Sequence, residues 1–265
     1  MNEKIIEVCR LNKSFYLDEG FFKRKNKEVL ALDNISMCLY KGETYGLVGE
    51  SGSGKTTLSR LLISMYPPLP STVFFYDENG CKKDVASLNT KELKEYRQKV
   101  KYIFQDPTKS LNPRLTVFDI LTDSLRYSSV HYKKEELIQK SIDVLERVEL
   151  SKDDLYKKST SFSGGQKQRI SLARALIMQP SVLICDEITS SLDTITQKEV
   201  LTLLKKLQKE NGLTIFFITH NLDVALSISD RIGVMKKGKL IEEGLKDDIL
   251  ENPKCEYTKM LFTGY

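Results

Sequence analysis

Short apolar runs of strand length recur along the chain, and several of them end at a polar residue or a glycine. They cover residues 45–48, 100–104, 182–185 and 213–219, and the residues that follow them are Gly49, Gln105, Asp186 and His220. Continuous apolar runs of this kind are typical of parallel strands that are covered on both faces. Because α/β sheets bind ligands at the carboxyl ends of such strands, the pattern predicts an α/β fold with its chemistry along one edge of a parallel sheet.

Other segments predict the remaining elements. Further strands are expected at 5–11, 35–40 and 73–76, and a hairpin at 232–235 and 240–242. Apolar residues at helical spacing predict helices over 57–65, 90–97, 118–127, 134–148 and 196–209, with two short helices at 245–250 and 256–262. The prolines at 67, 68 and 70 are expected to stop the first of these helices. Residues 115–178 lack the strand pattern of the rest and predict an inserted helical subdomain.

Composition narrows the class of protein only slightly. A chain of 265 residues with 40% hydrophobic content can bury one large core or two small ones, and its net charge of +5 neither requires nor excludes nucleic acid. The five cysteines are scattered, which favours a reducing compartment and argues against a zinc or iron–sulfur centre. A basic run at 23–25 is expected in a solvated hairpin loop, with contact to an anionic membrane as the alternative. With no signal-peptide pattern and no apolar run of the ~20 residues that span a bilayer, we expect a soluble, cytosolic protein or one that docks onto a membrane protein.

The strand over 45–48 leads into a phosphate-binding motif of the form G-x-x-x-x-G-K-[ST]. Its residues are Gly49, Glu50, Ser51, Gly52, Ser53, Gly54, Lys55 and Thr56. Glycines allow backbone N–H groups to converge on a phosphate, and the N-terminus of the following helix adds positive potential. We expect Lys55 to reach the terminal phosphates and Thr56 to ligate Mg²⁺. A chance glycine-rich turn is the alternative, and the strand and helix on either side argue against it.

Two carboxylates follow the buried strand over 182–185. Unpaired buried charge is costly, so the adjacent Asp186 and Glu187 predict a functional pair, with two exposed residues just past the strand end as the alternative. Alternation along the strand sends their side chains in opposite directions, so Asp186 could hold Mg²⁺ and Glu187 could polarise an attacking water. Gln105 could reach the metal or that water, although a plain turn explains it equally well. His220 is predicted to contact a γ-phosphate, whereas a lone histidine usually has a structural role.

Three further stretches allow two interpretations each. Ser163 caps a predicted helix, and Gly164 and Gly165 leave its first amides open, which makes a second candidate anion site or a simple cap with a hinge. A second phosphate site far along the chain makes sense only if two copies meet. Asp193 precedes another helix and could be only a cap. Phe15, at the end of the first strand, could pack in the core or stack on an adenine ring.

Together these motifs resemble the ATP-binding subunit of an ABC transporter over nearly the whole chain. Residues 49–56 resemble the Walker A motif, 182–187 the Walker B motif with its catalytic glutamate, and 162–166 the signature; Gln105, 191–193 and His220 match the Q-loop, the D-loop and the switch histidine. The resemblance implies ATP and Mg²⁺ as cofactors, Glu187, His220 and Gln105 as catalytic residues, and Thr56, Gln105 and Asp186 as metal ligands. The nucleotide-binding residues that it implies are Phe15, Gly49, Glu50, Ser51, Gly52, Ser53, Gly54, Lys55, Thr56, Thr57, Ser163, Gly164, Gly165, Gln166 and Asp193.

The resemblance also implies an architecture and a set of partners. The fold would be a P-loop NTPase (RecA-like) core with an antiparallel β subdomain and an inserted α-helical subdomain. A single domain would span 1–265, with the insertion at about 107–178 and a short C-terminal extension at about 244–265. The chain would lie at the cytoplasmic face of the cell membrane. Its partners would be two integral membrane permeases, a sister ATPase or a second copy of itself and, indirectly, an extracytoplasmic solute-binding protein, but no nucleic acid.

Four stretches resemble one branch of the family, the importers of oligopeptides, dipeptides and nickel. They are residues 104–107, 110–114 and 256–258 and the long loop before 30–32. The chain departs from the family pattern with Phe162 for leucine in the signature, Ile188 for proline and Ser191 for alanine, and none of these changes threatens ATP hydrolysis. The solute is selected by partners outside the chain, so a nickel or metal-chelate importer is the alternative. A soluble ABC ATPase acting on nucleic acid or ribosomes is a rival from another class, but such proteins usually carry two cassettes or long inserts.

Overall fold

The computed structural model describes three stretches of the chain, residues 3–17, 27–126 and 130–263. The basic run at 23–25 lies outside them. Residue contacts divide the chain into two compact units, of which the first comprises 1–93 with 216–265 and the second comprises 94–215. Within the described stretches, none of the helices combines the length and the apolar character that crossing a lipid bilayer requires.

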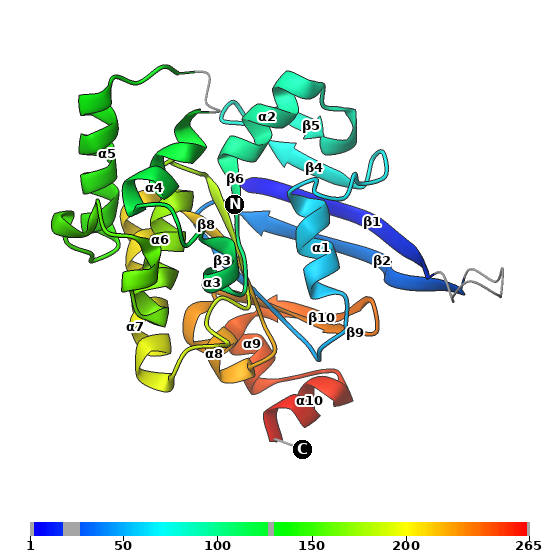
Figure 1. Cartoon of the computed structure of the whole chain (residues 1–265). Helices are drawn as coiled ribbons and strands as arrows, with labels where there is room; N and C mark the ends of the chain where they lie inside the picture. The colour runs from blue at the N-terminus through cyan, green and yellow to red at the C-terminus, as the bar shows by residue number, and fades with distance from the viewer. Residues whose placement is uncertain (1–2, 18–26, 127–129, 264–265) are drawn as a thin grey trace, which may run out of the picture. The chain divides into compact units, whose positions relative to one another are not determined.

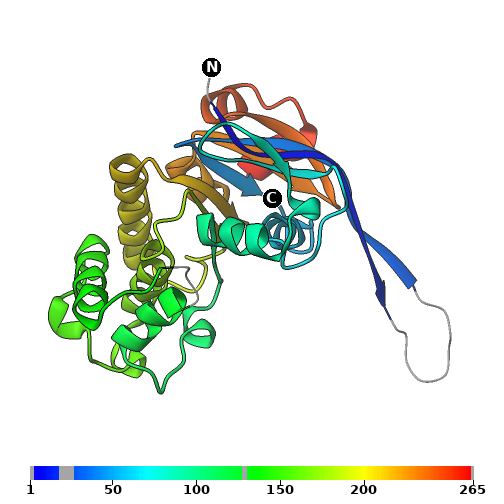
Figure 2. The same ribbon diagram turned by 90° about the horizontal axis from the view of Figure 1, so that it is seen from above.

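An antiparallel sheet with the strand order β2-β1-β4-β5 forms one part of the first unit (Figure 1). Its strands are β1 (Lys4–Leu17), β2 (Lys27–Tyr40), β4 (Val73–Tyr76) and β5 (Lys82–Asp84). β4 pairs with β1 at Ile6, Glu7 and Val8, while β2 follows β1 out to Leu17 and makes the long ribbon seen in Figure 2. This sheet confirms the predicted antiparallel subdomain. The hydrophobic pattern does not reveal β5, because two lysines and an aspartate form it and only backbone pairing joins it to β4.

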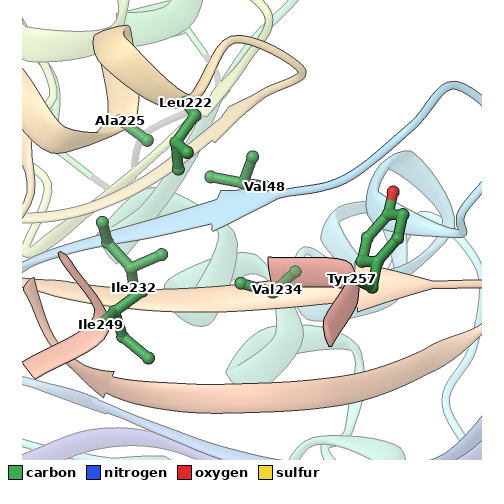
Figure 3. Close-up of a cluster of buried hydrophobic side chains, with 7 residues drawn as sticks. All are labelled: Val48, Leu222, Ala225, Ile232, Val234, Ile249 and Tyr257. Carbon is green, nitrogen blue, oxygen red and sulfur yellow. The ribbon is translucent and has the colours of Figure 1, made fainter. Parts of the chain in front are cut away.

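The rest of the first unit holds β10, β9, β3 and all but the first two residues of β8, strands that neighbour one another in the order β10-β9-β3-β8. They are β3 (Thr44–Val48), β8 (Thr214–Thr219), β9 (Arg231–Lys236) and β10 (Lys239–Leu245), and β3 runs parallel to β9. The helices here are α8 (Leu222–Ile228), α9 (Lys246–Glu251) and α10 (Glu256–Thr263). A buried apolar cluster joins β3, β9, α8, α9 and α10, and Figure 3 shows its members Val48, Leu222, Ala225, Ile232, Val234, Ile249 and Tyr257. The cluster anchors the carboxyl end of β3, from which the phosphate loop leaves.

Helix α1 (Lys55–Leu62) follows the phosphate loop and ends earlier than the sequence predicts. Ile63 caps its end, and Ser64 adopts a left-handed backbone with a φ of 54°. A left-handed residue cannot continue a right-handed helix. The prediction that the prolines at 67, 68 and 70 stop this helix is therefore wrong. After it come the 3₁₀ turn η1 (Val85–Ser87) and helix α2 (Thr90–Lys99), which begins in the first unit and ends in the second.

The second unit contains two parallel strands and a group of helices. Strand β6 (Val100–Ile103) pairs in parallel with β7 (Val182–Asp186). The helices are α3 (Pro107–Ser110), α4 (Val117–Arg126), α5 (Lys134–Arg147), α6 (Gly164–Leu176) and α7 (Thr194–Asn211), with 3₁₀ turns η2 (Lys152–Asp154) and η3 (Ser159–Ser161). The described residues between β6 and β7 thus form the predicted helices. The limits of the insertion as a separate subdomain stay a prediction.

Candidate functional site

The phosphate loop of the first unit, residues 49–54, connects β3 to α1. Gly54 has a φ of 106°, and a Cβ at this position would lie 2.6 Å from the carbonyl oxygen of Ala31. Only glycine fits such a backbone beside a neighbouring strand. The tip of the loop, formed by Glu50, Ser51 and Gly52, is exposed. The loop therefore has the bare, open backbone that a phosphate cradle requires.

Lys55, the first residue of α1, is 4% exposed, and its ammonium group is turned back into the loop. Nζ donates hydrogen bonds to the carbonyl oxygens of Gly49 at 2.6 Å and Glu50 at 2.8 Å. A buried charge of this kind must be compensated by hydrogen bonds. Here the main chain of the loop supplies them, next to Thr56 and Thr57, which are half-buried.

Phe15 lies on β1 with its ring half-buried. Its edge meets the ring of Tyr66 at a centroid distance of 5.5 Å, and Nζ of Lys13 lies 5.3 Å from the Phe15 centroid. A cation and an aromatic edge are favourable neighbours for a ring. The sequence gives no sign that Tyr66 belongs to this group, because it follows the end of α1 in a turn.

His220 follows β8 and is exposed, between two residues that fix the local backbone. The Thr219 hydroxyl accepts a hydrogen bond from the amide of Asn221, and Oδ1 of Asn221 accepts one from the amide of Val224. Asn221 thereby caps α8, a helix that the sequence analysis does not predict. These two bonds set the direction of the backbone at His220.

The second unit gathers the remaining strand-end residues into an acidic edge, which we define as Gln105, Asp186 and Glu187. Asp186, the last residue of β7, is 5% exposed, and its Oδ2 accepts a hydrogen bond from the hydroxyl of Tyr102 at 2.5 Å. Glu187 follows with a left-handed φ of 50°. Nε2 of Gln105 donates to Oε2 of Glu187 at 3.2 Å and to the Ser190 hydroxyl at 3.4 Å. The amide at one strand end thus contacts the carboxylate at the next.

The helix start at Ser163 has the geometry of a capping box. The Ser163 hydroxyl accepts from the amide of Gln166 at 3.3 Å, and Oε1 of Gln166 accepts from the amide of Ser163 at 3.0 Å. Ser163, Gly164 and Gln166 are exposed. Because the first amides of a helix have no partners within it, the surface of this start can accept an anion.

The same helix start packs against the beginning of α7. A Cβ at Gly165 would lie 2.3 Å from Cγ2 of Thr196, so only glycine allows the approach. The Thr196 hydroxyl donates to Oδ2 of Asp193 at 2.7 Å, and Oδ1 of Asp193 accepts from the amides of Ile195 and Thr196. The amide and the hydroxyl of Thr196 hold the pKa of Asp193 below its ordinary value. Asp193 is therefore a helix cap, and Thr196, to which it is hydrogen-bonded, packs against Gly165 of the signature-like stretch.

Arg169 ties α6 to its neighbours in the second unit. Its guanidinium donates to Glu149 at 2.7 Å, to Glu199 at 3.2 Å and to the carbonyl oxygen of Val148 at 3.3 Å. These partners belong to the end of α5 and to α7. Sequence reasoning misses both Arg169 and Tyr102, because their partners lie far away in the chain.

The donor atoms of the predicted metal ligands suit a hard cation. Thr56 offers a hydroxyl, Gln105 an amide oxygen and Asp186 a carboxylate, and Mg²⁺ prefers oxygen ligands of these kinds. Thr56 belongs to the first unit, and the other two belong to the second. By the chemistry of their donor atoms, each unit therefore carries residues of the kinds that the predicted nucleotide and metal require.

Comparison with known proteins identifies the class. Residues 32–190 match the family model for ABC transporters. The chain is 43% identical to the oligopeptide transport ATP-binding protein OppF of Bacillus subtilis, over 100% of this chain and 83% of that protein. It is 40% identical to the dipeptide transport ATP-binding protein DppF of Lactococcus lactis, over 99% of this chain and 81% of that protein.

Solved structures agree with this class. The structure of cbiO1 from Clostridium perfringens, part of the ABC transporter complex cbiONQ, gives a TM-score of 0.78 at 27% identity, covering 94% of this chain and 92% of that chain. The ATP-binding cassette MJ0796, in a dimeric post-hydrolysis state bound to ADP and Pi, gives 0.76 at 28% identity, covering 91% and 99%. The chain therefore belongs to the ABC transporter family. It has the fold of an ABC ATPase cassette, and its activity is ATP hydrolysis.

Proposed function

We propose that this chain hydrolyses ATP to power the import of a peptide-like solute through two integral membrane permeases to which it binds. The observation that carries the proposal is the 43% identity, along the whole chain, with an oligopeptide transport ATP-binding protein. The 40% identity with a dipeptide transport ATP-binding protein supports the same class of solute. Both lengths of peptide fall within the proposal, because partner proteins select the solute.

The first unit binds the nucleotide in this proposal. The amides of residues 49–54 and the ammonium of Lys55 bind phosphate oxygens, and Phe15 stacks on the adenine. Lys55 exchanges at least one of its two carbonyl acceptors for a phosphate oxygen, so its buried charge stays compensated. His220 contacts the γ-phosphate.

The second unit supplies the acidic groups for hydrolysis. Asp186 and Gln105, with Thr56 of the first unit, would hold Mg²⁺, which neutralises charge on the phosphate oxygens when bound. Glu187 orders the attacking water and accepts its proton at a carboxylate oxygen. The hydrogen bond from Gln105 to Oε2 of Glu187 orients that carboxylate, which supports the assignment.

The signature-like stretch serves a second cassette rather than its own. Residues 163–166 form a helix start with positive potential that is exposed at Ser163, Gly164 and Gln166. They would cover a nucleotide bound by a partner cassette, with Asp193 in the contact. The dimeric structures of MJ0796 support such a pairing. The partner cassette is a second copy of this chain or a sister ATPase.

The proposal is tested by assembling the chain with its permeases in proteoliposomes, with ATP supplied on the side of the membrane where this chain is bound. An extracytoplasmic solute-binding protein would deliver labelled oligopeptides, dipeptides or a nickel chelate. We expect uptake of one of the peptide classes, and ATPase activity that rises when the loaded binding protein is present. The chain should also sediment with membranes only when the permeases are expressed, as a protein at their cytoplasmic face would.

Replacing the chain with its Glu187→Gln variant provides the matched control and should abolish uptake without dispersing the complex. Uptake of the nickel chelate alone would replace the peptide assignment with a metal-chelate importer. An ATPase that ignores the permeases and responds to nucleic acid or ribosomes would overturn the transport assignment altogether.

A further inference from the structure

A tyrosine without a role in the proposal above contacts the acidic edge of the second unit. The hydroxyl of Tyr102 donates its hydrogen bond to Oδ2 of Asp186 over 2.5 Å. The tyrosine side chain is half-buried, and the aspartate is only 5% exposed. Short hydroxyl–carboxylate bonds are charge-assisted and rank among the stronger hydrogen bonds in proteins. The contact therefore holds the carboxylate firmly.

The register of the two strands explains why a tyrosine is needed here. Tyr102 on β6 pairs with Ile184 on β7, so their side chains share a face of the sheet. Asp186 lies on the same face two residues further along β7, which is roughly 6.6 Å at about 3.3 Å per residue. The phenol ring covers this distance and brings the hydroxyl to the carboxylate. A short polar side chain at position 102 would not reach.

Phe104 restrains the ring of Tyr102, and Gln105 makes a second contact with the acidic edge. The rings of Tyr102 and Phe104 meet edge to face, with centroids 4.8 Å apart and an angle of 61° between their planes. Gln105 then contacts Glu187 through its amide. The segment from 102 to 105 thus contacts both carboxylates of the acidic edge, one through Tyr102 and the other through Gln105.

We propose that Tyr102 is a positioning residue for the metal site, an inference that rests on the proposed function. Its hydroxyl fixes the orientation in which the Asp186 carboxylate meets Mg²⁺. Without the hydroxyl, part of the metal-binding energy is spent on orienting the carboxylate. Loss of a hydrogen bond to a metal ligand from an outer residue typically lowers metal affinity 10- to 100-fold.

Tyr102→Phe tests the inference, because it removes the hydroxyl and keeps the ring against Phe104. Calorimetry on the full chain gives the dissociation constant of ATP in EDTA and with Mg²⁺. The value in EDTA divided by the value with Mg²⁺ measures how much the metal strengthens binding. We expect the value in EDTA to be unchanged and the ratio to fall about 10-fold or more. The Mg²⁺ concentration for half-maximal ATPase should rise by a similar factor, with turnover at saturating Mg²⁺ retained.

Tyr76→Phe is the matched control, since the Tyr76 hydroxyl donates to Oε2 of Glu7 at 2.9 Å in the antiparallel sheet. It should lower thermal stability and leave the magnesium ratio unchanged. If Tyr102→Phe also leaves the ratio unchanged, or raises it, its hydroxyl only satisfies a buried group and the inference is overturned. If the wild-type chain binds ATP without any effect of Mg²⁺, the inference fails, whereas the proposed function is decided separately by solute uptake in the proteoliposomes.

Discussion

The phosphate loop of the first unit and the acidic edge of the second hold their charges in different ways. The loop compensates Lys55 with main-chain oxygens of Gly49 and Glu50. The acidic edge holds Asp186 and Glu187 with side chains from a neighbouring segment, Tyr102 and Gln105. A main-chain partner survives any substitution that preserves the loop backbone, whereas a side-chain partner depends on residue identity. We therefore expect substitutions of neighbours to tune the acidic edge more than the loop.

The largest expected effect separates turnover from binding. Glu187→Gln removes the proposed proton acceptor, and losing a general base typically slows a reaction 10²- to 10⁴-fold. We expect ATP turnover to fall at least ~100-fold, with ATP affinity at the phosphate loop unchanged. Steady-state ATPase and calorimetry on the same preparation measure both. The exposed Glu210 gives a matched control, Glu210→Gln, and wild-type turnover in Glu187→Gln would remove Glu187 from the catalytic role.

A variant in the first unit should show the opposite result, with ATP affinity lowered and turnover retained. Phe15→Ala removes the ring proposed to stack on adenine, and an aromatic–base stack contributes about 1–3 kcal/mol. We expect ATP affinity to fall about 5- to 100-fold, while turnover at saturating ATP stays close to that of the wild type. Tyr16→Ala, at the neighbouring residue with 68% exposure, should leave affinity unchanged. Unchanged affinity in Phe15→Ala would argue against stacking.

The last prediction concerns the stability of the fold rather than ATP binding or turnover, at a tightly packed position in the second unit. Gly165→Ala would drive a Cβ into Cγ2 of Thr196, and overpacking of this kind costs about 1–3 kcal/mol of unfolding free energy. Thr196→Ser removes that methyl group and keeps the hydroxyl that donates to Asp193. We expect the double variant to recover most of the lost stability in chemical denaturation. If Thr196→Ser does not restore stability, the clash with Cγ2 of Thr196 is not the cause of the destabilisation by Gly165→Ala.

Much of the framework is readable from sequence because polar residues interrupt continuous apolar runs. Strand β7 ends at Asp186 of the candidate site, and β3 and β8 end one residue before Gly49 and His220. The glycines of the loop mark the turn between β3 and α1. Strand β5 escapes prediction because it carries two lysines and an aspartate and so lacks an apolar signal. Helix α1 is predicted but ends at Leu62, before the left-handed Ser64 and before any of the prolines that follow.

The contacts that hold the site are harder to predict than the site itself. Tyr102 sits two residues from the end of an apolar run and looks like core, and only the register between β6 and β7 reveals its hydroxyl as a partner of Asp186. Arg169 meets Glu149 and Glu199 only once α5, α6 and α7 have packed. Such pairings depend on tertiary structure, so a single sequence carries no local signal for them.

The central claim is that residues 163–166 act on a nucleotide held by a partner cassette. The direct measurement uses ATP with a photoreactive group on its γ-phosphate, bound to a complex that pairs a Lys55→Ala version of this chain with a wild-type partner cassette. Mass spectrometry then maps the label on this chain. The account predicts that Lys55→Ala abolishes label near residues 49–56 but leaves label on 163–166, because the partner still holds its nucleotide. Loss of label from both stretches at once would contradict it.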